Sequence, residues 1–335
     1  MNPLEQLPIP LLEWYRDNAR SLPWRDDPTP YHVWVSEVML QQTRVAAVLD
    51  YYRRFMAEVP DVAALAALSE ERLMKLWQGL GYYSRARNLQ AAARQIMEEH
   101  GGSFPSDYQA VRALKGVGDY TAGAICSIAF GQPVPAVDGN VLRVVTRVTG
   151  DEGDITTPAM KAKVAAHLAP IIPLDDPGAF TQAMMELGAT VCLPNGAPLC
   201  DTCPARSFCT ARLENRVDML PVKTKKKARR VEERTVFLLI WDGRVLVRRR
   251  PDKGLLAGLW EFPNVEGWRT REEAAALLRE YQPEKLIPLR EAKHIFSHVE
   301  WRMAGFLAEC AFPGEPKEGE RWVTREELEG ECAVP

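Results

Sequence analysis

Two carboxylates, Glu37 and Asp138, lie in contexts that favour opposite protonation states. Glu37 is in the segment YHVWVSEVML (Tyr31–Leu40), which is apolar nearly all round. Desolvation there raises a carboxyl pKa, as a general acid working near neutral pH requires. Asp138 directly precedes the expected helix Asn140–Arg147, where the positive end of the helix dipole favours the ionised form. One protonated and one ionised carboxyl group form the pair that cleaves glycosidic bonds.

Both carboxylates also have ordinary explanations. Glu37 on the polar edge of its helix would face solvent, and Asp138 would be a helix cap without chemistry. Upstream of Asp138, Gly116 and Gly118 allow a tight turn whose free amides are suited to holding a phosphate oxygen. The alternative for these glycines is a plain turn between two helices.

Four cysteines lie within eighteen residues of one another. They are Cys192, Cys200, Cys203 and Cys209. Four thiolates this close need a metal to offset their mutual repulsion. A structural zinc site more often has two Cys-x2-Cys pairs, whereas this group has one pair with unequal flanking gaps, as iron–sulfur sites do. The spacing therefore favours a [4Fe-4S] cluster with a redox or a structural role.

The elements that must position these groups change in character along the chain. With 335 residues, two or three domains are expected. From Leu11 to about Val217 the apolar spacing is helical, with Ser69 as the N-cap of a helix over Glu70–Trp77 and a further helix over Ser84–His100. The segment Lys223–Arg234 then has seven basic and two acidic residues, which indicates a solvated linker suited to a phosphate backbone.

After the basic segment the pattern becomes that of strands. Thr235–Trp241, an Asp242-Gly243 turn and Arg244–Arg248 predict a hairpin. A helix over Arg271–Arg279 and strands over Ala292–His298 and Trp301–Glu309 complete a small α+β domain.

Composition narrows the functional classes. The net charge of -3 and pI of about 6.1 give no whole-protein attraction to nucleic acid, so DNA contacts must come from local basic patches. The N-terminus has no signal-peptide pattern, and the apolar run Val236–Trp241 is too short to span a bilayer. We therefore expect a soluble cytoplasmic protein with no membrane partner.

The motifs together resemble a known family. The Gly-Val-Gly hairpin, the VDGN corner and the cysteine group resemble helix-hairpin-helix DNA glycosylases. Four further motifs resemble the adenine DNA glycosylases of MutY type, and this similarity spans essentially the whole chain. They are LPWR (Leu22–Arg25), SEVMLQQT (Ser36–Thr43), GLGYYSRARNL (Gly79–Leu89) and FSH (Phe296–His298).

The resemblance implies a monofunctional base excision repair enzyme that removes adenine mispaired with 8-oxoguanine or guanine in double-stranded DNA. Glu37 matches the family's catalytic acid, which protonates adenine at N7 and later helps to activate water. Asp138 matches the residue that stabilises the sugar cation, with Asn140 and Tyr120 supporting it. Other matches are expected to contact DNA or to recognise the lesion: Trp24, Arg25, Gln42, Thr43, Leu80, Tyr82 (the wedge), Lys115, Gly116, Gly118, Phe296, Ser297 and His298.

The implied fold is multi-domain: an all-α helix-hairpin-helix glycosylase half with an iron–sulfur cluster lobe, then a small α+β MutT-like (Nudix-fold) domain. Residues 1–24 with 132–222 would form the cluster lobe, 25–131 the hairpin lobe, 223–234 a basic linker and 235–335 the MutT-like domain. We expect a monomer. Counting from Gly258, Asn264 stands where a Nudix hydrolase needs its first glutamate, so we expect a recognition module without hydrolase activity.

Two rival functions remain at this level. An endonuclease III-like lyase needs a Schiff-base lysine two residues after the Gly-Val-Gly, where this chain has Tyr120. A non-catalytic iron–sulfur DNA-binding protein would leave Glu37 and Asp138 as ordinary helix residues. The chain also departs from the family in two places: the first cysteine gap is seven residues instead of six, and the usual hairpin proline is Lys115.

Overall fold

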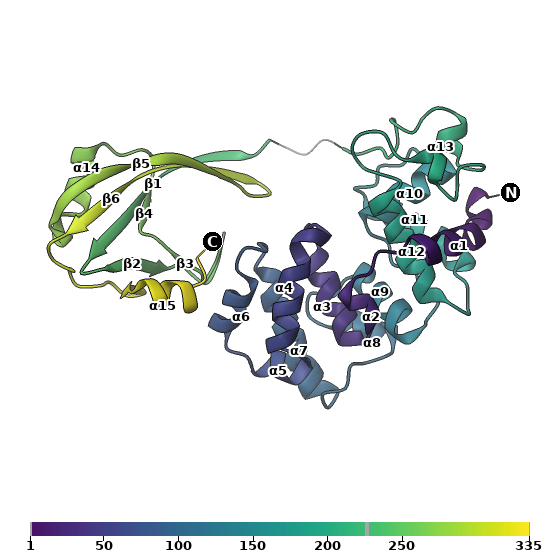
Figure 1. Cartoon of the computed structure of the whole chain (residues 1–335), viewed down its shortest axis with the longest axis horizontal. Helices are drawn as coiled ribbons and strands as arrows, with labels where there is room; N and C mark the ends of the chain where they lie inside the picture. The colour runs from purple at the N-terminus through teal and green to yellow at the C-terminus, as the bar shows by residue number, and fades with distance from the viewer. Residues whose placement is uncertain (1, 225–227, 335) are drawn as a thin grey trace. The chain divides into compact units, whose positions relative to one another are not determined.

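A computed structural model of the chain describes residues 2–224 and 228–334. The chain divides into two compact units, one of Met1–Ala67 with Arg87–Lys225 and the other of Leu68–Ala86 with Lys226–Pro335 (Figure 1). The boundary between them falls inside a helix, and residues 225–227 of the predicted basic linker lie outside the described residues.

The first unit is helical. Its elements are η1 (Pro3–Gln6), α1 (Pro8–Asn18), α2 (Pro23–Asp26), α3 (Pro30–Leu40), α4 (Val45–Glu58), α5 (Val62–Ala67), most of α7 (Ser84–Glu99), α8 (Tyr108–Ala113), α9 (Asp119–Phe130), α10 (Gly139–Thr149), α11 (Pro158–Leu168), η2 (Ala169–Ile171), α12 (Pro177–Thr190), η3 (Cys200–Thr202) and α13 (Thr210–Leu213).

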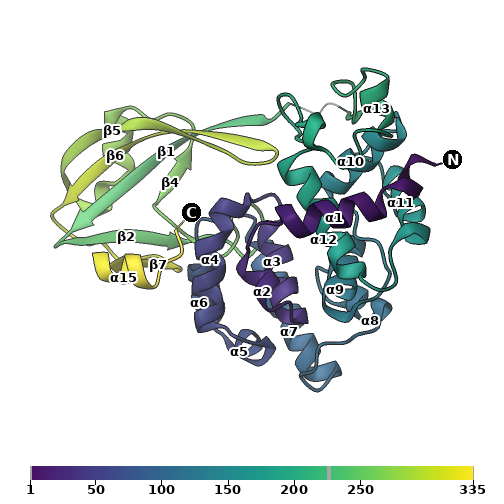
Figure 2. The same cartoon turned by 45° about the vertical axis from the view of Figure 1, so that its right-hand side comes forward.

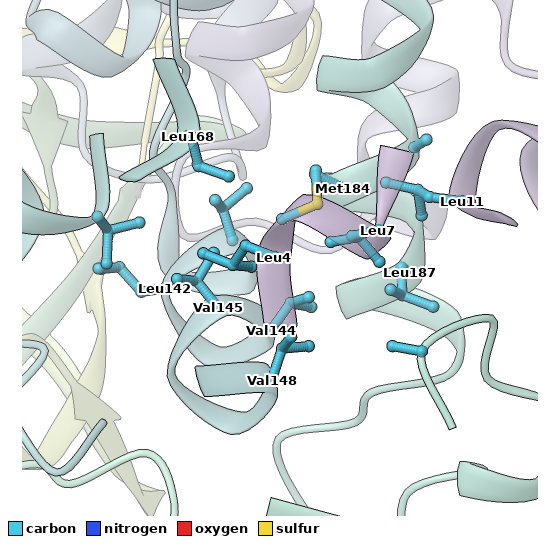
Figure 3. Close-up of a cluster of buried hydrophobic side chains, with 14 of the residues drawn as sticks. Leu4, Leu7, Leu11, Leu142, Val144, Val145, Val148, Leu168, Met184 and Leu187 are labelled. Carbon is cyan, nitrogen blue, oxygen red and sulfur yellow. The ribbon is translucent and has the colours of Figure 1, made fainter. Parts of the chain in front are cut away.

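One core of this unit joins the start of the chain to the cysteine segment. The sequence of α10 has valines at helical spacing, at positions 141, 144, 145 and 148, and all four side chains are buried. They pack with Leu4, Leu7 and Leu11 of the N-terminal segment and with Leu187 of α12 (Figure 3). Helix α1 runs alongside α12 (Figure 2). This core fixes the end of α10 at which Asp138 lies.

Helices α3 and α9 form the other buried part of the unit. Both sequences are apolar nearly all round, as expected of helices buried on all sides, and the two helices pack against each other. Because Gly123 of α9 has no Cβ, the carbonyl group of Pro135 can approach the helix closely. The segment that leads to Asp138 is thereby held against α9.

The second unit combines a helix of the central chain with a mixed sheet. Its elements are α6 (Glu70–Trp77), the first residues of α7, β1 (Arg230–Trp241), β2 (Arg244–Arg249), β3 (Trp260–Glu261), β4 (Asn264–Glu266), α14 (Arg271–Leu277), η4 (Arg279–Tyr281), β5 (Pro283–Ile295), β6 (Val299–Cys310), β7 (Glu320–Val323) and α15 (Arg325–Gly330).

The sheet has the order β3-β2-β1-β6-β5, with β4 paired to β1 and β7 paired to β2. Strand β1 is parallel to β6, and the other pairings are antiparallel. Consecutive residues of β2 face opposite sides of the sheet. Leu246 packs in one cluster with Ala274 of α14 and with Leu278 and Tyr281, which follow α14. Val247 packs in another cluster with Leu328 of α15. Helices α14 and α15 therefore cover opposite faces of the sheet (Figure 1).

The structure corrects two predicted boundaries. Strand β1 begins at Arg230, so residues 230–234 belong to the sheet and not to the linker. Strand β5 begins at Pro283 and ends at Ile295, so Ser297 and His298 lie in the turn before β6 and not in a strand. The predicted hairpin is confirmed, with Trp241 paired to Arg244 across the Asp242-Gly243 turn. Within the described residues, no helix is long and apolar enough to cross a membrane.

Candidate active site

Helix α3 carries Glu37 into the interior of the first unit. The helix begins at Pro30 after the N-cap Thr29, whose side chain accepts a hydrogen bond from the His32 amide. Glu37 is only 6% exposed. The alternative in which this carboxyl group faces solvent is therefore wrong.

Burial gives Glu37 the protonation behaviour of a general acid. It raises the pKa of Glu37 from 4.5 to about 7. The hydroxyl group of Tyr120 donates a hydrogen bond to Glu37 Oε2, which lowers the pKa, while the negative charge of Asp138 raises it. Close to neutral pH the group can therefore hold a proton and release it.

Asp138 is the N-cap of α10, as the sequence predicts. Its Oδ1 accepts from the Val141 amide at 2.7 Å, and its Oδ2 accepts from Asn140 Nδ2 at 2.8 Å. Burial nevertheless raises the pKa of Asp138, while these two donors and the charge of Arg143 act to lower it. The hydrogen-bond donors therefore favour the ionised form of Asp138, and desolvation disfavours it. The helix dipole alone does not determine the protonation state of this residue.

Tyr120 and Asn140 also lie at this site. Besides its bond to Glu37, the Tyr120 hydroxyl is 3.8 Å from Met185 Sδ. The side chain of Asn140 accepts a hydrogen bond from Arg143 Nη2 at 2.8 Å. The four residues predicted to be catalytic thus form two hydrogen-bonded pairs, and the charge of Asp138 acts on Glu37.

Arg143 is a supporting residue that we did not single out from the sequence. It donates to the carbonyl groups of Gly188 at 2.7 Å and Cys192 at 2.7 Å as well as to Asn140. Gly188 is required here, because a Cβ would lie 2.5 Å from Asn140 Cβ. The spacing of Asn140 and Arg143, three residues apart on one helix, is a signal that could have identified the pair.

Glu186 is a second buried carboxylate that the sequence did not reveal. It is 1% exposed and accepts hydrogen bonds from Arg20 Nε at 2.6 Å and Arg25 Nη2 at 2.8 Å. Although burial acts to raise its pKa, the bonds from Arg20 and Arg25 bring the pKa of Glu186 below its usual value. Arg25, which is predicted to contact DNA, forms this ion pair and lowers the pKa of Glu37 through its charge.

Trp24 and Leu80 were also predicted to contact DNA, and the structure places both in the interior. Trp24 is 6% exposed and packs edge-on against Tyr52, with ring centroids 5.2 Å apart. Leu80 is 6% exposed. Because neither side chain reaches the surface, the structure favours a packing role for both residues.

The predicted hairpin connects α8 to α9. Gly116 has a φ of +75°, and a Cβ there would lie 2.6 Å from Asn88 Cβ, so only glycine suits this position. Gly118 has an ordinary φ of -98° and caps α9 without a side-chain hydrogen bond. Lys115 is exposed at the turn. The hairpin thus offers an exposed cation beside a helix N-terminus, which suits an anion.

Two other predicted recognition residues follow α3 directly. Gln42 is exposed and has a φ of +60°, a conformation that is uncommon outside glycine. Thr43 is half-buried, and its hydroxyl lies 3.4 Å from the carbonyl group of Gln41. Backbone strain of this kind is often found in functional loops.

The remaining predicted recognition residues lie together in the second unit. Tyr82 is 44% exposed with a φ of +48°, and its hydroxyl is 2.9 Å from Ser297 Oγ. Ser297 and His298 are exposed in the turn between β5 and β6, while Phe296 is half-buried. The exposure of Tyr82 is compatible with the predicted wedge.

The four clustered cysteines line one pocket of the first unit. Arg147, Arg206 and Arg212 line the same pocket, and Arg147 Nη1 donates to Cys192 Sγ at 3.3 Å. Burial raises the pKa of Cys203 to about 12, and the other three thiols add to the shift. In the described ranges no three His, Cys, Asp or Glu side chains converge on a single metal ion. A [4Fe-4S] cluster does not need that convergence, because each thiolate binds a different iron atom.

The helix that would carry the glutamates of a Nudix hydrolase is apolar on its inner side. Ala274 of α14 and the following Leu278 and Tyr281 pack in the core of the second unit. Asn264, at the position of the first glutamate, lies in β4 and accepts a hydrogen bond from Arg234 at 3.1 Å. By the same count from Gly258, the last two glutamates of the box would stand at Ala276 and Leu277, which carry no carboxylate for magnesium.

Comparison with known proteins agrees with the fold. The family model described as HhH-GPD superfamily base excision DNA repair protein matches residues 35–170, and a NUDIX domain model matches residues 235–335. An endonuclease III–DNA complex aligns with a TM-score of 0.53 and 25% identity, covering 63% of this chain and 97% of that one. A thermostable thymine-DNA glycosylase aligns with a TM-score of 0.57 and 24% identity, covering 63% and 98%. The class is thus that of helix-hairpin-helix base excision repair proteins with an added Nudix-like domain, and the predicted fold class is confirmed.

Curated relatives narrow this class. The adenine DNA glycosylase of Mus musculus is 39% identical, with 95% of this chain and 74% of the relative aligned. That of Buchnera aphidicola from Schizaphis graminum is 32% identical over 90% of this chain and 87% of the relative. The chain belongs to the adenine DNA glycosylase family, which confirms the resemblance found in its motifs.

Proposed function

We propose that the protein is a base excision repair enzyme that hydrolyses the N-glycosidic bond of adenine paired with 8-oxoguanine or guanine. The observation that carries this proposal is the buried Glu37, with a pKa of about 7, hydrogen-bonded to Tyr120 and exposed to the charge of Asp138. Adenine-specific glycosylases among the relatives support the choice of base.

In this reaction each carboxyl group has its own role. Protonated Glu37 donates its proton to N7 of adenine, which makes the base a better leaving group. Ionised Asp138 then stabilises the oxocarbenium-like sugar, with its oxygens held by Asn140 and the Val141 amide. Deprotonated Glu37 accepts a proton from the water that attacks the sugar carbon, so the carboxyl group is restored.

Double-stranded DNA is the proposed partner, and the aligned endonuclease III is in a complex with DNA. The adenine must leave the base stack, and the unstacking energy, on the order of a few kcal/mol, must be offset by contacts to the emptied duplex. We assign Tyr82 as the wedge, Gln42 and Thr43 to the region of the lesion, and Lys115 with Gly116 and Gly118 to the phosphate backbone. The Phe296–His298 turn would sense 8-oxoguanine.

We further propose that Cys192, Cys200, Cys203 and Cys209 hold a [4Fe-4S] cluster. The pocket they share is also lined by three arginines, whose charge favours thiolate ligands. The bound cluster would supply a structural cross-link within the cysteine segment, in a pocket that residues of α10 and α12 also line. A site with four cysteine ligands leaves no open coordination position for substrate, so the carboxylates carry the hydrolysis.

The experiment that tests this function is an adenine-release assay on matched duplexes. One set contains adenine opposite 8-oxoguanine or guanine, and a second set contains oxidised pyrimidines. We expect release of adenine from the first set and no excision from the second. Excision of oxidised pyrimidines, with robust covalent capture on abasic DNA by borohydride, would instead identify an endonuclease III-like lyase, which the absence of an amine at Tyr120 disfavours.

A further inference from the structure

The turn that carries Ser297 is held by backbone and side-chain hydrogen bonds. The Phe296 amide donates to the Val299 carbonyl group at 2.8 Å, which closes the turn. The Phe296 carbonyl group accepts from Arg229 Nε at 3.1 Å, and the His298 carbonyl group accepts from the Arg230 amide at 3.1 Å. The turn is therefore attached to the start of β1 as well as to its own strands.

Beneath this turn lies an aromatic platform formed by Trp301 of β6. The Phe296 ring meets Trp301 edge to face, with centroids 5.1 Å apart and an interplanar angle of 75°. His294 packs on Phe296 with centroids 4.4 Å apart. The Phe296–Trp301 geometry is favourable because the positive edge of one ring meets the negative face of the other. The orientation of Phe296, and with it the path of the next residue, depends on the indole.

The indole of Trp301 is buried and has several polar and charged partners. Trp301 is 8% exposed, and its Nε1 donates to Glu232 Oε2 at 2.9 Å. The guanidinium carbons of Arg234 and Arg250 lie 4.5 and 5.3 Å from its ring centre, at cation–π distance. A buried ring with this many partners has one orientation, so Trp301 connects the rigid sheet to the exposed turn.

We propose that Trp301 is a positioning residue for lesion discrimination, which holds the Phe296–His298 turn so that the Ser297 hydroxyl meets the base opposite adenine in one orientation. The inference rests on the proposed function, in which this turn senses 8-oxoguanine. Without the ring, ordering the turn would be an added entropic cost of binding the lesion. Adenine removal itself, which depends on the carboxylates of the first unit, would not need Trp301.

The test measures single-turnover adenine release opposite 8-oxoguanine and opposite guanine, and takes the ratio of the two rates. We expect Trp301→Leu to lower this ratio about fivefold, in the range of one weakened hydrogen bond. Trp301→Phe keeps an aromatic face for Phe296, so this variant should retain most of the wild-type ratio. The matched control is Trp322→Leu, since Trp322 also has an indole hydrogen bond, to Pro313 at 2.9 Å, and two aromatic neighbours.

A purely structural role for Trp301 predicts different results. The ratios for Trp301→Leu and Trp322→Leu would then be equal, and that result would overturn the inference. In the Ser297→Ala background, Trp301→Leu should lower the ratio no further, because both substitutions act through the Ser297 hydroxyl group. Additive losses in the double variant would also contradict the inference. If the leucine variant does not fold, Trp301→Met takes its place, because methionine has about the volume of leucine, has no ring and adapts its shape to irregular gaps.

Failure of the proposed function gives a separate pattern. If Ser297→Ala leaves the ratio unchanged, the turn does not sense the lesion, and both the recognition role and the inference are wrong. If Ser297→Ala lowers the ratio and neither Trp301→Leu nor Trp301→Met does, only the inference is wrong.

Discussion

The hydroxyl group of Tyr120 donates a hydrogen bond to the buried carboxyl group of Glu37. In a lyase of the same superfamily, the position of this tyrosine is expected to carry the Schiff-base lysine. Here the phenol acts on the acid instead: it opposes the effect of burial, which raises the pKa of Glu37 to about 7. Tyr120 thus provides no amine for a Schiff base and lowers the pKa of the carboxyl group that we propose as the proton donor.

The first prediction concerns the pH dependence of adenine release. Because the acid must be protonated, the single-turnover rate should fall as the pH rises through the pKa of Glu37, about 7. Tyr120→Phe removes a hydrogen bond that lowers this pKa, so the midpoint of the decline should move to higher pH. A pH–rate profile of both proteins measures the shift, and an unchanged midpoint would contradict the role assigned to Tyr120.

The second prediction concerns stability. In the folded protein the pKa of Glu37 is raised from 4.5 to about 7, so the folded state binds this proton more tightly than the unfolded state. The free energy of unfolding therefore falls as the pH rises through that interval, by about 3 kcal/mol in all. Glu37→Gln has no titrating group at this position, so its free energy of unfolding does not fall in this way. Above pH 7 it should exceed that of the wild type by up to about 3 kcal/mol.

Denaturant unfolding at alkaline and at acidic pH checks this prediction. The difference between Glu37→Gln and the wild type should shrink as the pH falls toward 4.5, where both states of the wild type become protonated. A difference that is independent of pH would mean that Glu37 does not titrate as its burial requires.

The third prediction concerns the packing of α12 against Asn140. Gly188→Ala would place a Cβ 2.5 Å from Asn140 Cβ, and relief of this overlap should cost about 1–3 kcal/mol of stability. Displacement of Asn140 should also slow adenine release, because its amide supports Asp138. For the control Gly139→Ala, a Cβ meets no atom within 4 Å, so its unfolding free energy should stay close to the wild-type value. Equal stability of the two variants would contradict the close approach.

The fourth prediction concerns the cysteine pocket. Cys203→Ser should reduce bound iron from about four atoms per chain to near zero and destabilise the first unit, because metal binding contributes directly to folding. Cys310→Ser, which changes a half-buried thiol of the other unit, should retain the iron. Iron analysis and thermal unfolding of both variants test this prediction. Iron retained by Cys203→Ser would show that Cys203 is not a ligand of the cluster.

Much of the site could be predicted from local sequence. An unbroken apolar run around Glu37 predicts its burial, and the aspartate before α10 predicts the N-cap, because both depend on neighbours in the chain. Glu186 and Arg25 are different. Their ion pair joins residues 161 positions apart, and nothing in either local segment indicates the partner. For the same reason the sequence predicts a DNA contact for Arg25 but not this ion pair.

Strand β5 shows a second limit. Pro283 and Pro288 argue against a strand, yet β5 lies at the edge of the sheet, where a missing amide hydrogen is tolerated. Its residues are mostly exposed, so they lack the alternation of a half-buried strand. Edge position depends on the order of strands in the sheet, which cannot be read from the strand's own sequence.

The most direct test of the central claim is single-turnover adenine release by Glu37→Gln on 8-oxoguanine·adenine duplexes, with duplex affinity measured beside it. Gln keeps an acceptor for the Tyr120 hydroxyl but cannot donate the catalytic proton. We predict that the rate of adenine release falls at least about 100-fold, while duplex affinity stays close to that of the wild type. Turnover at the wild-type rate would contradict the assignment of Glu37 as the acid.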